Sequence, residues 1–260
     1  MSQARTRLDQ ALVERGLYES REKARRAVMA GQVLVDGQPA TKPGQSIKKD
    51  HELELKEKER FVSRGGHKLD HAIEAFGLPV AGLIAADLGA STGGFTDCLL
   101  QRDVRRVHAI DVGMGQLAWK LRQDKRVRVM EKTNARHLKS DSLPEMMDLV
   151  VIDCSFISLR QILPAAQALL RPGGDIIALI KPQFEAGKEI VDRGKGVVRD
   201  PAIHESILKS LKVFVDQSLA MDWIDHTTSP ILGPAGNREF LVRLQKHATR
   251  DDSDWADRQP

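Results

Sequence analysis

Four ionisable side chains occur at points of the sequence where a parallel α/β sheet would bring them together. Asp153 ends one apolar, strand-like segment, and Lys181 directly follows the next. Glu239 opens the final predicted strand, and Lys68 begins a helix that precedes the first. Ligands of such sheets lie beyond the carboxyl ends of the strands, where a final antiparallel strand would start. We therefore expect two ammonium groups and two carboxylates to face one crevice.

Such a group of side chains could turn a hydroxyl group into a nucleophile. Lys181 would stabilise the developing alkoxide or take its proton, and the carboxylates of Asp153 and Glu239 would hold both ammonium groups in place. This chemistry requires no metal ion. The alternative is that the four residues form ordinary ion pairs at the protein surface.

A glycine-rich turn follows the first predicted strand. The apolar run 83–86 leads into segment 87–97, which starts with an acid and contains three glycines, and a second strand ends on Asp111. Glycines let the backbone approach a ligand, and an acid about twenty residues later can accept hydrogen bonds from ribose hydroxyls. This layout predicts a nucleoside site, and its spacing differs from the G-x-G-x-x-G of dinucleotide sites. A purely structural turn is the alternative.

The N-terminal residues read as a separate module. A helix at 21–30 is predicted to be capped by Ser20 and stopped by Gly31, and strands are expected at 32–37 and 51–55. This order resembles the small RNA-binding module first described in bacterial ribosomal protein S-four, and a docking module with a solvated basic helix is the alternative. The resemblance implies that six side chains contact RNA: Arg7, Ser20, Arg21, Lys23, Arg25 and Arg26.

The larger part of the chain resembles known methyltransferases. Acid-x-Gly at the end of the first strand is similar to motif I of S-adenosylmethionine (SAM)-dependent methyltransferases, and Lys68, Asp153, Lys181 and Glu239 resemble the tetrad of the FtsJ-related ribose 2′-O-methyltransferases. Combined with the N-terminal module, they resemble the TlyA (hemolysin A) family of ribosomal RNA methyltransferases. The likeness runs from about residue 7 to 245 and is carried by segments 62–68, 85–95, 151–156, 180–184 and 236–239.

The resemblance implies a fold, a substrate and a cofactor site. The expected fold is a Rossmann-like class I SAM-dependent methyltransferase sheet of seven strands, the last one antiparallel, with a small α+β N-terminal domain. The expected substrate is a ribose 2′-OH, of cytidine, in ribosomal RNA or ribosomal subunits. The side chains and backbone expected around SAM are Asp87, Gly89, Ala90, Ser91, Gly93, Gly94, Phe95, Asp111, Asn134 and Ala135.

The chain is expected to divide into four parts. These are an RNA-binding domain at 1–59, a linker at 60–67, a methyltransferase domain at 68–246 and a disordered tail at 247–260. Within the large domain we expect a short helix at 115–121 and a polar loop at 183–199 that could act as a lid. Oligomeric state is not predicted.

The composition is compatible with a cytoplasmic protein. It is also compatible with binding to nucleic acid, but it does not require such binding. The net charge is +4, and 41% of the residues are hydrophobic, which is enough for a core. Two cysteines are too few for a disulfide framework or a zinc site. The sequence has neither an apolar signal core at its start nor a run of eighteen apolar residues, so no stable membrane association is expected.

Three other functions compete with ribose methylation. Segment 153–156 lies where amino-methyltransferases carry Asp-Pro-Pro-Tyr, which would suggest methylation of a base nitrogen, and Cys154 could be a nucleophile for cytosine C5 methylation or simply a packed residue. The hemolysin name of the resembling family suggests a membrane-active protein, but no long basic amphipathic helix supports it. The last alternative is a non-catalytic ribosome-binding factor.

Overall fold

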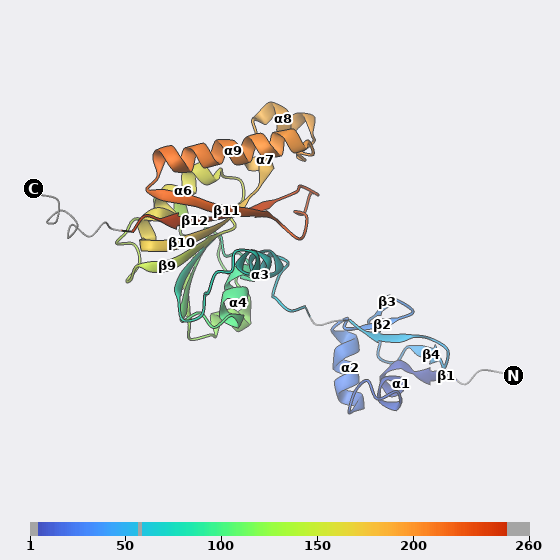
Figure 1. The fold of residues 1–260 in the computed structure, drawn as a ribbon. Helices are drawn as coiled ribbons and strands as arrows, with labels where there is room; N and C mark the ends of the chain where they lie inside the picture. The colour runs from blue at the N-terminus through green and yellow to red at the C-terminus, as the bar shows by residue number, and fades with distance from the viewer. Residues whose placement is uncertain (1–4, 57–58, 249–260) are drawn as a thin grey trace, which may run out of the picture. The chain divides into compact units, whose positions relative to one another are not determined.

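The chain folds into two compact units, Met1–Arg60 and Phe61–Pro260 (Figure 1). The computed structural model describes residues 5–56 and 59–248, so most of the tail predicted at 247–260 lies outside the described residues. Among the described helices, none is both long and apolar enough to cross a membrane.

The first unit packs two helices against short strands. Side chains of α1 and α2, such as Leu12 and Val28, are buried together with Val33 and Ile47 from two strands. Its elements are β1 (Arg5–Arg7), α1 (Leu8–Glu14), α2 (Arg21–Met29), β2 (Val33–Val35), β3 (Gln38–Ala40), β4 (Ser46–Lys48) and β5 (Leu53–Leu55). β1 pairs with β4, and β3, β2 and β5 form a second small sheet.

The second unit contains a seven-stranded sheet in the order β11-β12-β10-β9-β6-β7-β8. β12 is antiparallel to both of its neighbours, and the pairs among β10, β9, β6, β7 and β8 are all parallel. This is the mixed sheet that the sequence predicts. The strands are β6 (Ile84–Leu88), β7 (Arg106–Ile110), β8 (Val127–Met130), β9 (Met147–Ile152), β10 (Leu170–Ile180), β11 (Met221–Thr228) and β12 (Phe240–Lys246).

Helices cover both faces of this sheet (Figure 1). Val150 and Ile152 of β9 belong to the buried cluster that includes α6 and α9, whereas Leu149 and Val151 belong to the cluster that includes α3 and α4. A central parallel strand is buried on both faces, which explains why β9 is almost wholly apolar. The helical elements are α3 (Gly65–Ala75), α4 (Gly94–Gln101), α5 (Trp119–Arg122), η1 (Ala135–His137), α6 (Leu159–Leu169), α7 (Pro182–Glu185), α8 (Lys188–Arg193) and α9 (Pro201–Ser218).

Strand register brings the predicted chemistry to one edge of the sheet. Leu88, the last residue of β6, pairs with Ile110 and Ile152, the last residues of β7 and β9. Ile180 at the end of β10 pairs with Phe240 at the start of β12. Because these ends are aligned, the residues that follow β6, β7, β9 and β10, and the residue that precedes β12, share one edge.

Three local predictions differ from the structure. The helix expected at 115–121 is only α5, because Gly115 has a φ of 74°, which a right-handed helix cannot use. The loop at 183–199 contains most of α7 and all of α8. α3 begins at Gly65, within the segment 60–67 predicted as a linker, and a Cβ on Gly66 would lie 2.2 Å from the Phe61 ring. That glycine serves close packing inside a helix rather than a turn.

Candidate active site

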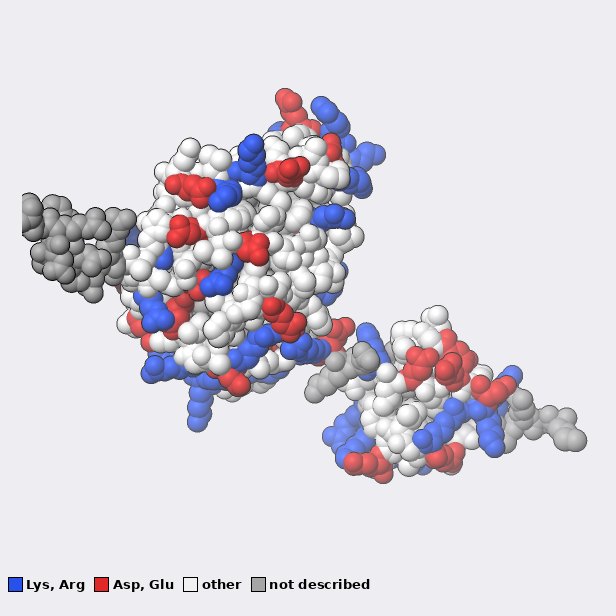
Figure 2. Space-filling model, in the orientation of Figure 1, with Lys and Arg blue, Asp and Glu red and all other residues white. Residues whose placement is uncertain are grey.

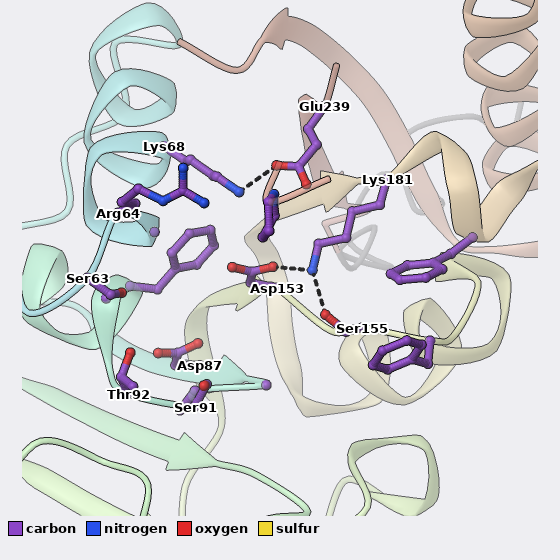
Figure 3. A pocket seen from close by; sticks show the side chains of 18 of the residues that line it. Ser63, Arg64, Lys68, Asp87, Ser91, Thr92, Asp153, Ser155, Lys181 and Glu239 are labelled. Carbon is purple, nitrogen blue, oxygen red and sulfur yellow. Dashed lines mark hydrogen bonds and ion pairs between the residues drawn. The ribbon is translucent and has the colours of Figure 1, made fainter. Parts of the chain in front are cut away.

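The four predicted catalytic side chains lie together as two ion pairs (Figure 3). Lys68 Nζ is 2.5 Å from Glu239 Oε2, and Lys181 Nζ is 2.6 Å from Asp153 Oδ1. All four line one cavity of about 430 Å³. The two ion pairs are therefore neighbours on one cavity rather than unrelated ion pairs at the protein surface.

Each member of the tetrad is fixed by backbone structure. Asp153 directly follows β9, and its N–H donates to the carbonyl of Leu88 over 3.0 Å. Lys181 follows β10 as the N-cap of α7, and Glu239 directly precedes β12. Lys68 lies in the first turn of α3 rather than at its first residue. Four separate elements thus position one group of charges.

Burial makes both ion pairs obligatory. Lys68 is 7% exposed, Lys181 8% and Glu239 1%. An isolated charge at such a depth would be costly, whereas a paired and hydrogen-bonded charge is tolerated. The Lys181 ammonium uses three acceptors: Asp153, the Cys154 carbonyl at 3.1 Å and the hydroxyl of Ser155 at 3.0 Å. Its donor capacity is therefore filled within the protein.

The glycine turn lies against the tetrad. Gly89 has a φ of 86°, and a Cβ there would lie 2.9 Å from the carbonyl oxygen of Asp153. Only glycine allows this approach. Gly93 has a φ of 96° and caps α4, and a Cβ on it would lie 2.2 Å from Leu121. Gly93 lines neither the tetrad cavity nor the second cavity described below, so the structure gives it a packing role.

Asp87 is the fully buried acid at the base of the turn. Its Oδ2 accepts from the N–H of Thr96 at 3.0 Å and from the Thr96 hydroxyl at 2.7 Å. Its Oδ1 is buried and has no hydrogen-bond partner among the described residues. Burial, opposed by the Thr96 hydrogen bonds, raises the pKa of Asp87 to about 7. A buried acceptor left unpaired calls for a ligand or a proton.

A second cavity of about 470 Å³ adjoins the first, and both are lined by Gly89, Ser91 and Asp153. Asp111, Asn134 and Ala135 line this second cavity and are absent from the lining of the first. The remaining residues predicted around the cofactor, apart from Gly93, line the first: Asp87, Ala90, Gly94 and Phe95. The predicted set therefore surrounds two joined spaces.

Asp111 holds the turn as well as lining the cavity. Its Oδ2 accepts from the N–H of Ser91 at 2.8 Å, and its Oδ1 accepts from the N–H of Gly113 at 2.7 Å. A carboxylate oxygen has further lone pairs, so both atoms can still accept from a ligand hydroxyl.

Several residues that line the first cavity were not predicted. Ser63 and Arg64 enter it from the segment before and at the start of α3, and Gln183 enters from α7. Phe156 is 92% exposed, has a φ of 64°, and lies 5.4 Å from the ring of Phe184. Its position three residues after Asp153 was the available signal, since an aromatic ring beside a predicted catalytic residue is well placed to meet a substrate.

Cys154 is poorly suited to act as a nucleophile. Its thiol is 3.4 Å from the Leu88 carbonyl, to which it donates. Burial raises the pKa of the Cys154 thiol to about 12. The reactive form of cysteine is the thiolate, and a thiol with so high a pKa forms little thiolate at neutral pH.

The predicted RNA-contacting side chains lie in the first unit and have different surroundings. Ser20 accepts from the N–H of Lys23 at 3.3 Å, so it serves as the N-cap of α2. Arg7 and Arg21 both pair with the buried Asp9, at 2.9 and 3.4 Å. Basic and acidic side chains occur together on the visible face of each unit (Figure 2).

The exposed basic residues of α2 divide into paired and unpaired groups. Lys23 pairs with Glu19, and Arg26 pairs with Glu22 at 2.8 Å. Arg25 is exposed, and no ion pair joins it to another described residue. Arg25 is therefore the member of the set with a guanidinium free for an external anion.

Each of the two units of the chain matches a known protein family. Residues 61–246 match the FtsJ-like methyltransferase family, and residues 6–53 match the S4 domain. The fold and site thus define an FtsJ-like methyltransferase that carries an S4 domain.

Individual relatives place the chain more narrowly. It is 50% identical over 248 residues to YqxC of Bacillus subtilis, covering 94% of this chain and 87% of the relative. It is 45% identical over 250 residues to the 16S/23S rRNA (cytidine-2′-O)-methyltransferase TlyA of Mycobacterium tuberculosis, covering 95% and 92%. A solved structure from Streptococcus thermophilus has a TM-score of 0.71 at 46% identity, covering 95% and 90%. The chain belongs to the TlyA family.

Proposed function

We propose that this protein transfers a methyl group from SAM to a ribose 2′-OH of ribosomal RNA, with cytidine as the target nucleoside. The observation that carries the proposal is the pair of ion pairs, Lys68–Glu239 and Lys181–Asp153, on one cavity beside the glycine turn. The name of the Mycobacterium tuberculosis relative supports both the ribose position and the cytidine.

The two joined cavities fit SAM. The unpaired Oδ1 of Asp87 suits the ammonium of the methionine part, and the turn at Gly89 leaves no Cβ in the way. Asp111 suits ribose hydroxyls, and Asn134 and Ala135 suit the adenine. When bound, SAM supplies an electrophilic methyl group.

The tetrad prepares the nucleophile. The target hydroxyl would replace Ser155 as a partner of Lys181, because it offers the same kind of acceptor and the Ser155 side chain can rotate away, whereas the Cys154 carbonyl is fixed in the backbone. Lys181 would then stabilise the oxygen as its proton passes to solvent and the oxygen takes the methyl group from the sulfonium, which would leave as a neutral thioether. Asp153 would keep the ammonium aimed at the oxygen. Lys68 has two donors beyond its bond to Glu239, so it adds positive charge at the same cavity.

Two features suit an RNA substrate. The exposed ring of Phe156 lies beside the tetrad and offers a face on which a base can stack. The N-terminal unit matches the S4 domain, and its Arg25 is exposed with no ion pair to any residue that the structure describes. Stacking on Phe156 would hold a base at the tetrad, and phosphate contacts of the N-terminal unit would add separately to the affinity for the RNA chain.

The test is methyl transfer from labelled SAM to unmodified bacterial ribosomal RNA or subunits, followed by alkaline digestion. A 2′-O-methyl blocks attack of the ribose hydroxyl on its own phosphate, so we expect label in an alkali-resistant dinucleotide. Label in a mononucleotide would place the methyl on a base. Absence of label together with absence of SAM binding in calorimetry would support a non-catalytic ribosome factor.

Base methylation is less well supported than ribose methylation. C5 transfer needs a thiolate, and the pKa of Cys154, raised by burial to about 12, opposes it. Transfer to an exocyclic nitrogen would leave Lys68 and Glu239 without a role. The membrane-active alternative predicts leakage of liposomes by the pure protein, which a dye-release assay measures directly.

A further inference from the structure

We propose that Glu185 is a positioning residue for the methyl transfer, because it fixes the far end of the loop 153–158 that carries Asp153. The inference rests on the proposed function. Glu185 Oε2 accepts from the Ser158 hydroxyl at 2.7 Å, and its Oε1 accepts from the N–H of Leu159 at 2.7 Å.

The loop is therefore held at both ends by one short helix. Lys181, the N-cap of α7, bonds to Asp153, Cys154 and Ser155 at the start of the loop. Glu185, the last residue of α7, bonds to the N-terminus of α6 at the end of the loop. The partners of Lys181 and the partners of Glu185 are thus parts of one clamped segment.

The middle of the loop needs this support. Phe156 has a φ of 64°, which is strained for a side chain with a Cβ and persists only where the surroundings hold it. Apart from its contact with Phe184, the Phe156 ring is 92% exposed, so packing of the ring contributes little to holding the backbone. The two clamped ends are the stronger restraint.

Truncation of Glu185 should lower the rate of transfer without weakening cofactor binding. In Glu185→Ala we expect kcat to fall about 10- to 100-fold, because a displacement of about 1 Å in a positioned group costs up to that factor. KM for SAM should stay within about twofold, since Glu185 lines neither of the two joined cavities. Ser158→Ala removes one of the two bonds, and we expect a smaller loss in kcat.

Glu185→Gln is the conservative rescue. Its carbonyl can accept from the N–H of Leu159, and its NH₂ can donate to the Ser158 hydroxyl once that hydroxyl reverses its role. We expect kcat within about threefold of the wild type. Glu205→Gln, an exposed change on α9, is the matched control and should leave kcat unchanged.

The two cysteines supply a second readout that needs no activity. Cys154 lies in the clamped loop, whereas Cys98 is buried in α4. Glu185→Ala should speed reaction of Cys154 with N-ethylmaleimide several-fold, while Cys98 stays unreactive, which shows that the fold is intact. Glu185→Gln should restore the slow rate.

The outcomes separate the two proposals. Wild-type kcat and wild-type thiol reactivity in both Glu185→Ala and Ser158→Ala would overturn the clamp. Loss of kcat in Glu185→Ala with no recovery in Glu185→Gln would also overturn it. If the wild-type protein gives no alkali-resistant product, the proposed function fails, but the thiol rates still test the clamp.

Discussion

The two sides of the site differ in how their charges are satisfied. On the tetrad side all four members of the tetrad have a partner within the chain: Lys68 with Glu239, and Lys181 with Asp153. Under the glycine turn, Asp87 keeps one buried oxygen without a partner among the described residues. The comparison suggests that a site built to act on a group can be complete before the ligand arrives, whereas a site built to hold a ligand leaves an acceptor open.

Removal of the central ammonium should have the largest effect. In Lys181→Ala we expect methyl transfer to RNA to fall about 10³-fold or more, because stabilisation of the developing alkoxide is lost. SAM binding should stay nearly intact. Labelled transfer and calorimetry measure the two quantities, and an equal loss of both would show that Lys181 belongs to the cofactor side.

The open acceptor should make stability depend on pH. The pKa of Asp87, about 7 against an ordinary 3.8, means that the folded chain keeps a proton that the unfolded chain loses between about pH 4 and 7. The stability from this group is complete below about pH 4 and is lost as pH rises through 7, by up to about 4 kcal/mol. Asp87→Asn should remove that fall.

Melting curves without SAM, from pH 5 to 8, compare the wild type with Asp87→Asn. The difference in Tm between the two proteins should change with pH in favour of the variant at high pH. If the Tm of the two proteins instead changed with pH in parallel, Asp87 would not gain its proton on folding, and its pKa would not be raised.

The same substitution, Asp87→Asn, should weaken the binding of SAM. An amide cannot form the charge-assisted bond that we assign to Asp87, so SAM should bind about 10- to 100-fold more weakly to Asp87→Asn. At saturating SAM, kcat should stay near the wild-type value. Calorimetry at pH 8 measures the affinity, and unchanged binding would remove Asp87 from the cofactor site.

The first unit also contains arginines with and without an ion-pair partner among the described residues. Their substitution should have the smallest effect of the proposed changes. Arg25→Ala should raise KM for RNA a few-fold and lower the salt dependence of binding by about one phosphate contact. Arg26→Ala should do less, because Arg26 is paired with Glu22. Filter binding at several salt concentrations measures both, and equal effects would show that internal pairing does not decide which arginine meets RNA.

The strand ends could be predicted from the sequence because their chemistry is local. A nearly all-apolar run that stops at Asp153, or just before Lys181, already indicates a buried parallel strand that reaches a ligand edge. The antiparallel last strand was expected from the resemblance to the methyltransferases, because apolar runs alone do not give the direction of a strand. The pairing itself, Lys181 with Asp153 and Lys68 with Glu239, required the fold, because the partners of the second pair are 171 residues apart.

The residues that sequence reasoning missed depend on tertiary packing. Glycine is unfavourable inside a helix, yet Gly66 lies within α3. A glycine fits there because the Phe61 ring occupies the space that a side chain would need. The hydrogen bonds of Glu185 join the end of α7 to the N-terminus of α6, and no periodic pattern in the sequence connects these two places. Ser20 was predicted both as a cap and as an RNA contact, and the structure supplies evidence for the cap.

The close approach of Gly89 to the carbonyl of Asp153 limits how this enzyme can change. Any side chain at residue 89 would push against the backbone of the loop that carries Asp153. A variant selected to accept a bulkier cofactor analogue at the turn would therefore disturb the reacting group as well. Enlargement is better sought at Asn134 and Ala135, which border the second cavity and are absent from the lining of the tetrad cavity.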